Sequence, residues 1–167
     1  MPSIPLQRTL AISSLFYAAA LWGLVWYPYR LLDEAGVGGI ASAFFSYAAP
    51  LLLLGWLHLR ALHTARGQWL WLSALGLAAG WTNLAYVLAV LEGEVVRVLL
   101  LFYLSPLWTV LFSRFLLHEK LNRAGWAVMA LAAGGALAML WQPGDWPLPA
   151  NRAEWLALSA GVMFAAS

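Results

Sequence analysis

Five long apolar stretches alternate along the chain with short charged connectors. The apolar stretches cover residues 9–29, 35–59, 67–91, 98–113 and 124–144. Four of them are long enough to cross the roughly 30 Å hydrocarbon core of a bilayer as helices, and 98–113 nearly is. Because backbone amides in lipid must be paired within their own segment, spans of this length are expected to be helical. The pattern predicts an all-α polytopic membrane helix bundle of five complete transmembrane helices, at about 9–29, 37–59, 68–91, 96–117 and 123–141.

The composition agrees with a lipid environment and excludes several classes of function. Charged residues make up 10% of the chain and hydrophobic residues 63%, whereas soluble domains carry about 25% charged residues. The net charge of +2 is spread over the connectors, so it gives no nucleic-acid signal. The absence of cysteine excludes thiolate metal sites, and the three histidines lack a metal-ligand spacing. We therefore expect a lipid bilayer as the partner, with no nucleic acid, metal, cofactor or catalytic residue.

The distribution of basic residues predicts the orientation of the bundle. If the five stretches cross the membrane, six basic residues fall on one side and three on the other; the three are Arg30, Arg97 and Arg152. The side with more Lys and Arg is usually cytoplasmic. We therefore expect a multi-pass protein of a bacterial-type inner membrane, with its N-terminus in the cytoplasm.

Three residues are predicted to shape the helices rather than to bind solute. Gly23 in the first stretch would let another helix come close. Pro106, at the centre of the fourth stretch, frees the carbonyl of Phe102 from its helical partner; it either acts as a hinge or holds a permanent kink. Glu119, beside Lys120, is predicted to join a cytoplasmic ion network between the fourth and fifth helices.

A sixth apolar run begins near the C-terminus of the chain. Residues 156–167 (LALSAGVMFAAS) match residues 10–21 (LAISSLFYAAAL) at the positions of Leu10, Ala11, Ser13, Ala19 and Ala20. A repeat of five spans must return in the opposite orientation, as in the inverted repeats of many secondary transporters. We therefore divide the chain into a five-helix repeat at residues 1–150 and the start of a truncated sixth helix at 151–167.

The run LFYLSPLWTVLFSRFLLHEKLNRAGWAVMALAAGGALAML, at residues 101–140, carries a family resemblance. Its mid-helix proline, the Glu that ends the fourth helix and the glycines of the fifth helix resemble the EamA-like branch of the drug/metabolite transporter superfamily. The Trp-Gly pair of the first helix also fits, and the resemblance covers roughly residues 9–141. It implies ten helices in two inverted halves, of which this chain would be the N-terminal half, with the C-terminal five-helix half missing.

The strongest charged candidate for substrate binding is Arg97. It would attract an anionic solute at the outer mouth; alternatively, it lies at the interface and pairs with Glu92 or Glu94. Tyr103 is a second candidate on the same helix. The six positions between them correspond to a rotation of about 240°, so the two need not share a cavity.

Four further residues are candidates near the middle of the spans. Asn83 would hydrogen-bond a solute or bridge two helices. Tyr86 and Trp22 would form aromatic walls for a solute or simply pack. Ser105 lies beside Pro106 and offers a hydroxyl to a solute or to the freed backbone.

The resemblance implies transport of a small organic solute, such as an amino acid, related metabolite or drug-like compound, by alternating access. Two alternatives stay open: a small multidrug-resistance-like antiporter subunit, and a non-transporting membrane scaffold subunit. The antiporters use a Glu within the first helix, and residues 9–29 contain none. Because no Asp or Glu lies deep within a span, proton coupling through this half is not expected.

Overall fold

The computed structural model describes residues 4–55, 67–116, 118, 122–141 and 148–167, and eight helices lie within them. The helices are α1 (Ile4–Leu24), α2 (Trp26–Glu34), α3 (Gly39–Leu54), α5 (Trp69–Glu92), α6 (Val95–Phe102), α7 (Ser105–Leu116), α8 (Arg123–Leu140) and α9 (Arg152–Ala166). The described part of the chain is therefore an assembly of helices joined by short connectors.

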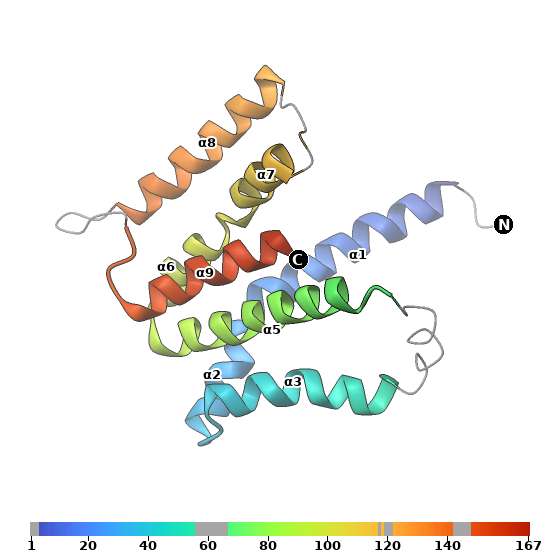
Figure 1. Cartoon of the computed structure of the whole chain (residues 1–167), viewed down its shortest axis with the longest axis vertical. Helices are drawn as coiled ribbons and strands as arrows, with labels where there is room; N and C mark the ends of the chain where they lie inside the picture. Colours follow the sequence, from blue (N-terminus) through green and yellow to red (C-terminus); the bar gives the residue numbers. More distant parts are fainter. Residues whose placement is uncertain (1–3, 56–66, 117, 119–121, 142–147) are drawn as a thin grey trace.

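The long helical stretches run back and forth between two ends of the molecule, each opposite in direction to the one before it (Figure 1). Among the described residues, four helical stretches are long and apolar enough to cross a membrane: Arg8–Glu34, Trp69–Glu92, Val95–Leu116 and Arg123–Leu140. The apolar helix Gly39–Leu54 is shorter, and the rest of the predicted second span lies outside the described residues. These lengths and the alternating directions are those of a polytopic membrane bundle.

The first span is longer than the predicted 9–29 and is interrupted rather than ended by Pro28. Helix α1 stops at Leu24 and α2 continues from Trp26 to Glu34. Proline at 28 lacks an N–H and crowds the carbonyl four residues earlier, at Leu24. The interruption falls at that point, and the chain is helical again after one residue.

The fourth span divides into α6 and α7 just before Pro106. Tyr103 and Leu104 form a turn between the two helices. The amide of Tyr103 still donates to the carbonyl of Leu99, at 2.8 Å, whereas Leu104 donates to Leu101 at 3.4 Å. The proline therefore produces a break two residues before itself, in the middle of an otherwise continuous apolar span.

The buried core is centred on α9, which packs against α5, α6 and α7. Small residues make this packing close: Ala85 and Ala89 of α5 and Ala157 and Ala160 of α9 are almost fully buried. A Cβ on Gly93 would come within 2.7 Å of the Cβ of Ala153. The short sixth run therefore provides the centre of the described bundle.

Three glycines of the earlier spans do not meet other helices in the same way. An added Cβ on Gly23, Gly76 or Gly80 would find no atom within 4 Å. The sequence predicted that another helix would come close to Gly23, but none of the described helices does so. Close approaches lie at Gly39, where α3 meets α5, and at Gly93 and Gly161, where α9 meets α5 and α6.

Candidate functional site

Arg97 lies at the first turn of α6 and joins three helix ends. Its Nε and Nη2 donate to the Glu154 carboxylate at 2.8 and 3.2 Å, and its Nη1 donates to the carbonyl of Leu140 at 3.3 Å. The two side chains are buried, with 7% of Arg97 and 4% of Glu154 exposed. The two-pronged contact matches the planar guanidinium to the carboxylate, so Arg97 holds the beginning of α9 and the end of α8 onto α6.

Glu154 is fixed by its own helix as well as by Arg97. Its carboxylate accepts from the amide of Ala150 at 2.9 Å and from Asn151 Nδ2 at 3.0 Å, and Asn151 Oδ1 accepts from the amide of Glu154. This is a reciprocal cap of the capping-box type at the start of α9. The carboxylate has four donors around it, which offset the cost of burying its charge.

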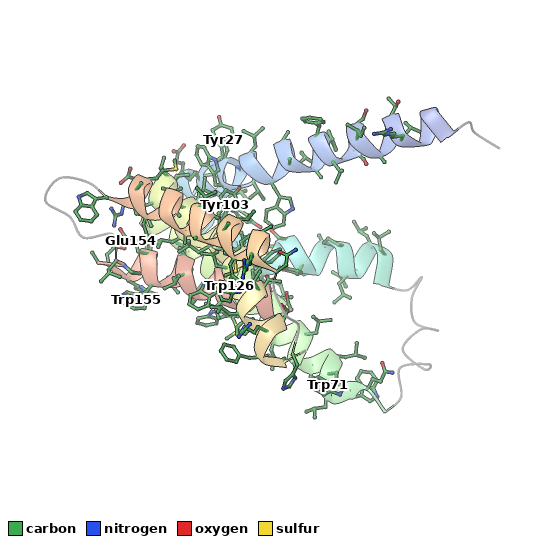
Figure 2. The ribbon with its side chains drawn as sticks, turned by 90° about the horizontal axis from the view of Figure 1, so that it is seen from above. Tyr27, Trp71, Tyr103, Trp126, Glu154 and Trp155 are labelled. Carbon is green, nitrogen blue, oxygen red and sulfur yellow. The ribbon has the colours of Figure 1, made fainter. Side chains whose placement is uncertain are left out.

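Arg30 of α2 performs a similar task on the end of α5. Its Nε and Nη2 donate to the carbonyls of Val90 and Gly93 at 3.1 and 3.0 Å. The last carbonyls of a helix have no intrahelical partner, and a cation there also suits the helix dipole. Arg30 and Arg97 therefore pin five helices together at one end of the bundle, the end at which Glu154 lies (Figure 2).

An aromatic cluster is centred on Phe102, at the end of α6 beside the helix break. The Phe102 ring lies 6.5 Å from Trp22 of α1, 5.2 Å from Tyr86 of α5, 5.9 Å from Tyr103 and 5.6 Å from Phe164 of α9, between ring centroids. We call these five residues the Phe102 cluster. Its inner members, Phe102 and Tyr86, are buried, whereas Trp22, Tyr103 and Phe164 are about half exposed.

Asn83 lies one turn before Tyr86 and belongs to a polar chain across three helices. Its Nδ2 donates to Tyr29 Oη at 3.4 Å, Tyr29 donates to Ser46 Oγ at 3.0 Å, and Ser46 donates to the carbonyl of Ser42 at 2.8 Å. Asn83 thus bridges α5 to α2. Its Oδ1 is buried and accepts no hydrogen bond from the described residues.

Side-chain hydroxyls supply only some of the hydrogen bonds that the backbone carbonyls near Pro106 can accept. Ser105 is buried, and its carbonyl accepts from Thr109 Oγ1 at 3.1 Å. The carbonyl of Phe102, which Pro106 leaves unpaired within the helix, lies against Gly161 of α9, where an added Cβ would approach it to 2.9 Å. On the other side of the break, Tyr103 and Pro106 line an apolar groove of about 340 Å³ that also borders α8.

The structure brings some of the candidate residues together and separates others. Trp22, Tyr86 and Tyr103 meet in the Phe102 cluster, and Ser105 begins the helix that follows it. Asn83 joins a separate polar chain, and Arg97 lies in the ion pair at the end of the bundle. Glu119 lies outside the described residues.

Two residues of the site have no signal in the sequence pattern. Phe102 is one apolar residue among many in its span, and only the break after it makes it central. Glu154 stands 57 positions from Arg97, and no spacing in the sequence pairs the two residues. The described residues contain no group of three His, Asp or Glu that could hold a metal ion.

The alternating apolar helices, with the ion pairs of the described residues at one end, define a multi-pass membrane protein with a helix break at its centre. Comparison with known proteins gives the particular family. The chain belongs to the EamA-like transporter family, whose model matches residues 9–141. This family belongs to the drug/metabolite transporter superfamily.

Three curated relatives carry transporter names. The uncharacterized transporter PA0485 of Pseudomonas aeruginosa is 29% identical over 153 residues, which cover 88% of this chain and 49% of the relative. The uncharacterized transporter in the cobO 3′ region of Sinorhizobium sp. is 33% identical over 117 residues, which cover 64% of this chain and 82% of the relative. The uncharacterized transporter YojE of Bacillus subtilis is 28% identical over 138 residues, which cover 76% and 46%.

The chain thus spans about half the length of two of these relatives. No solved structure matches it.

Proposed function

We propose that this chain is one half of a carrier that moves a small organic solute, such as an amino acid or a related metabolite, by alternating access. The other half would be an inverted five-helix unit, and the solute site would lie between the two. The observation that carries the proposal is the Phe102 cluster, because rings from α1, α5, α6 and α9 converge beside a helix break in the middle of a span. Broken helices are where such carriers form their sites.

The buried and the exposed members of the Phe102 cluster would contribute differently to solute binding. Phe102 and Tyr86 form a fixed inner wall, whereas about half of the surface of Trp22 and of Tyr103 is open. Aromatic faces attract apolar, aromatic and cationic groups of a solute. The Oδ1 of Asn83, one turn from Tyr86, is buried, so it would accept a hydrogen bond from an N–H or O–H group of the solute only after the helices around it separate.

Arg97 has a different part in this proposal. Its guanidinium donates to Glu154 and Leu140, so attraction of an anionic solute, which stays a prediction, requires this ion pair to open. We assign Arg97 to holding one end of the bundle closed while the opposite end is spread (Figure 1).

Solute flux into liposomes that contain the full-length protein tests the proposal, with a panel of radiolabelled amino acids, nucleosides and drug-like cations. For a transported solute, we expect Trp22→Ala to lower the initial rate roughly tenfold, because an aromatic contact contributes about 0.5–1.5 kcal/mol beyond its buried area. Trp71→Ala is the matched control, since Trp71 lies exposed at the far end of α5. Absence of flux for the whole panel, or equal loss in both variants, would reject the proposed site.

A further inference from the structure

Helix α9 is built into the unit formed by α5, α6 and α7, although it begins the second copy of the repeat. Its residues Ala153, Ala157, Ala160 and Gly161 are buried on one face. Polar contacts fix it on both sides: Trp81 Nε1 of α5 donates to Ser159 Oγ at 3.2 Å, and Arg97 of α6 binds Glu154. By its packing, the first helix of the second repeat therefore belongs to the first repeat.

Helix α1, in contrast to α9, is exposed along most of its length. Between Arg8 and Leu24 every residue is exposed, including Leu15 at 71% and Phe16 at 75%. Its N-terminal part extends beyond the other helices (Figure 2). Trp22 at its far end contacts Phe102 and Phe164, so only the last turns of α1 reach the cluster.

The sequence match between the two helices gives their correspondence. Aligning residues 10–21 with 156–167 places Ala11 opposite Ala157, Ser14 opposite Ala160 and Leu15 opposite Gly161. These three counterparts are buried in α9. The two helices also run in opposite directions in both views, as members of an inverted repeat must (Figures 1 and 2).

We propose that the two halves exchange their first helices. Helix α9 completes the first half, and the face of α1 that contains Ala11, Ser14 and Leu15 packs into the second half, against the helices that correspond to α5, α6 and α7. The occupant of this face is the polypeptide that follows Ser167 in the full-length chain, for which the doubled length of two relatives leaves room. This inference rests on the inverted second half of the proposed function.

Site-specific photo-crosslinking in the full-length protein, reconstituted in liposomes, tests the exchange. Photoreactive benzoylphenylalanine replaces Leu15, Tyr17 or Leu156 in separate variants, and crosslinked peptides are located by mass spectrometry. Leu15 is the probe for the exchanged face. Tyr17 is the matched control, because its counterpart Met163 is 40% exposed on α9. Leu156 is the positive control, because it packs on the core cluster of α5 and α6.

We expect the probe at Leu15 to crosslink to peptides beyond Ser167, with a yield several-fold above that at Tyr17, and the probe at Leu156 to crosslink within residues 81–108. Crosslinks from Leu15 to lipid alone, to residues 26–140, or to a second copy of this half would overturn the exchange. Flux measured on the same liposomes before irradiation separates the two proposals. Absent flux with a crosslink beyond Ser167 rejects transport and keeps the exchange, whereas flux without that crosslink rejects the exchange alone.

Discussion

The ion pair of Arg97 and Glu154 shows most clearly how the partner of a residue determines the role assigned to it. The sequence left Arg97 between a solute site and an interfacial charge paired with Glu92 or Glu94. The structure places it against Glu154 and the end of α8, and Glu92 forms an exposed ion pair with Arg152 at 3.5 Å. Only the packing of α9 onto α6 brings these partners together.

Removing one member of this buried pair should cost more than removing both charges. For Arg97→Gln we expect a loss of about 3 kcal/mol or more in the free energy of unfolding, because the Glu154 carboxylate stays buried without its cation. Arg97→Gln combined with Glu154→Gln should recover much of that loss. Reversible unfolding in detergent, followed by tryptophan fluorescence, measures both. If the double variant loses the sum of the two single losses, the pair is not coupled.

The Arg97→Gln variant also separates the two interpretations of this arginine. A fall in protein yield with an unchanged transport rate per molecule supports the packing role. A changed rate for anionic solutes at an unchanged yield would assign Arg97 to the solute site.

At the scale of elements, the break between α6 and α7 and the small-residue face of α9 depend on each other. Pro106 frees the carbonyl of Phe102, and Gly161 lets α9 approach that carbonyl closely. A side chain at 161 would push the helices apart at the point where Phe102 and Phe164 meet. The contact between helices therefore fixes the cluster as well as the core.

Gly161→Ala should destabilise the bundle by about 1–3 kcal/mol, since the new Cβ would lie 2.9 Å from a backbone oxygen that cannot move freely. Gly80→Ala is the control, because its Cβ would meet no atom within 4 Å; we expect no loss there. Thermal unfolding of the two variants in the same detergent gives the comparison. Equal melting temperatures would show that α9 does not approach α6 at Gly161.

At the scale of the whole molecule, the fold class follows from the sequence, because length and hydropathy alone specify helices that cross lipid. The break at Pro106 could also be predicted, since proline acts on its own helix. The Phe102 cluster and the partner of Arg97 could not be predicted from the sequence. They depend on which helices touch, and apolar spans in lipid carry little information about their neighbours.

The contacts at the two ends of the bundle indicate how the molecule would work as a carrier. Arg30 and Arg97 tie helices together at one end, while the helices diverge toward the other (Figure 1). The Phe102 cluster lies between these ends. In this account solute reaches the cluster from the spread end, and access from the tied end requires the helices there to separate. The cytoplasmic position of the N-terminus stays a prediction.

Reaction of a single cysteine at position 103 with a membrane-impermeant maleimide tests the central claim most directly. The chain described here has no cysteine, so Tyr103→Cys is made in a full-length protein freed of any others, and labelling in dodecyl sulfate confirms that the thiol is reactive. The account predicts that reagent added to sealed liposomes labels position 103 and that a transported solute slows this labelling. A thiol that reacts in dodecyl sulfate but from neither face of the membrane, with or without solute, would contradict it.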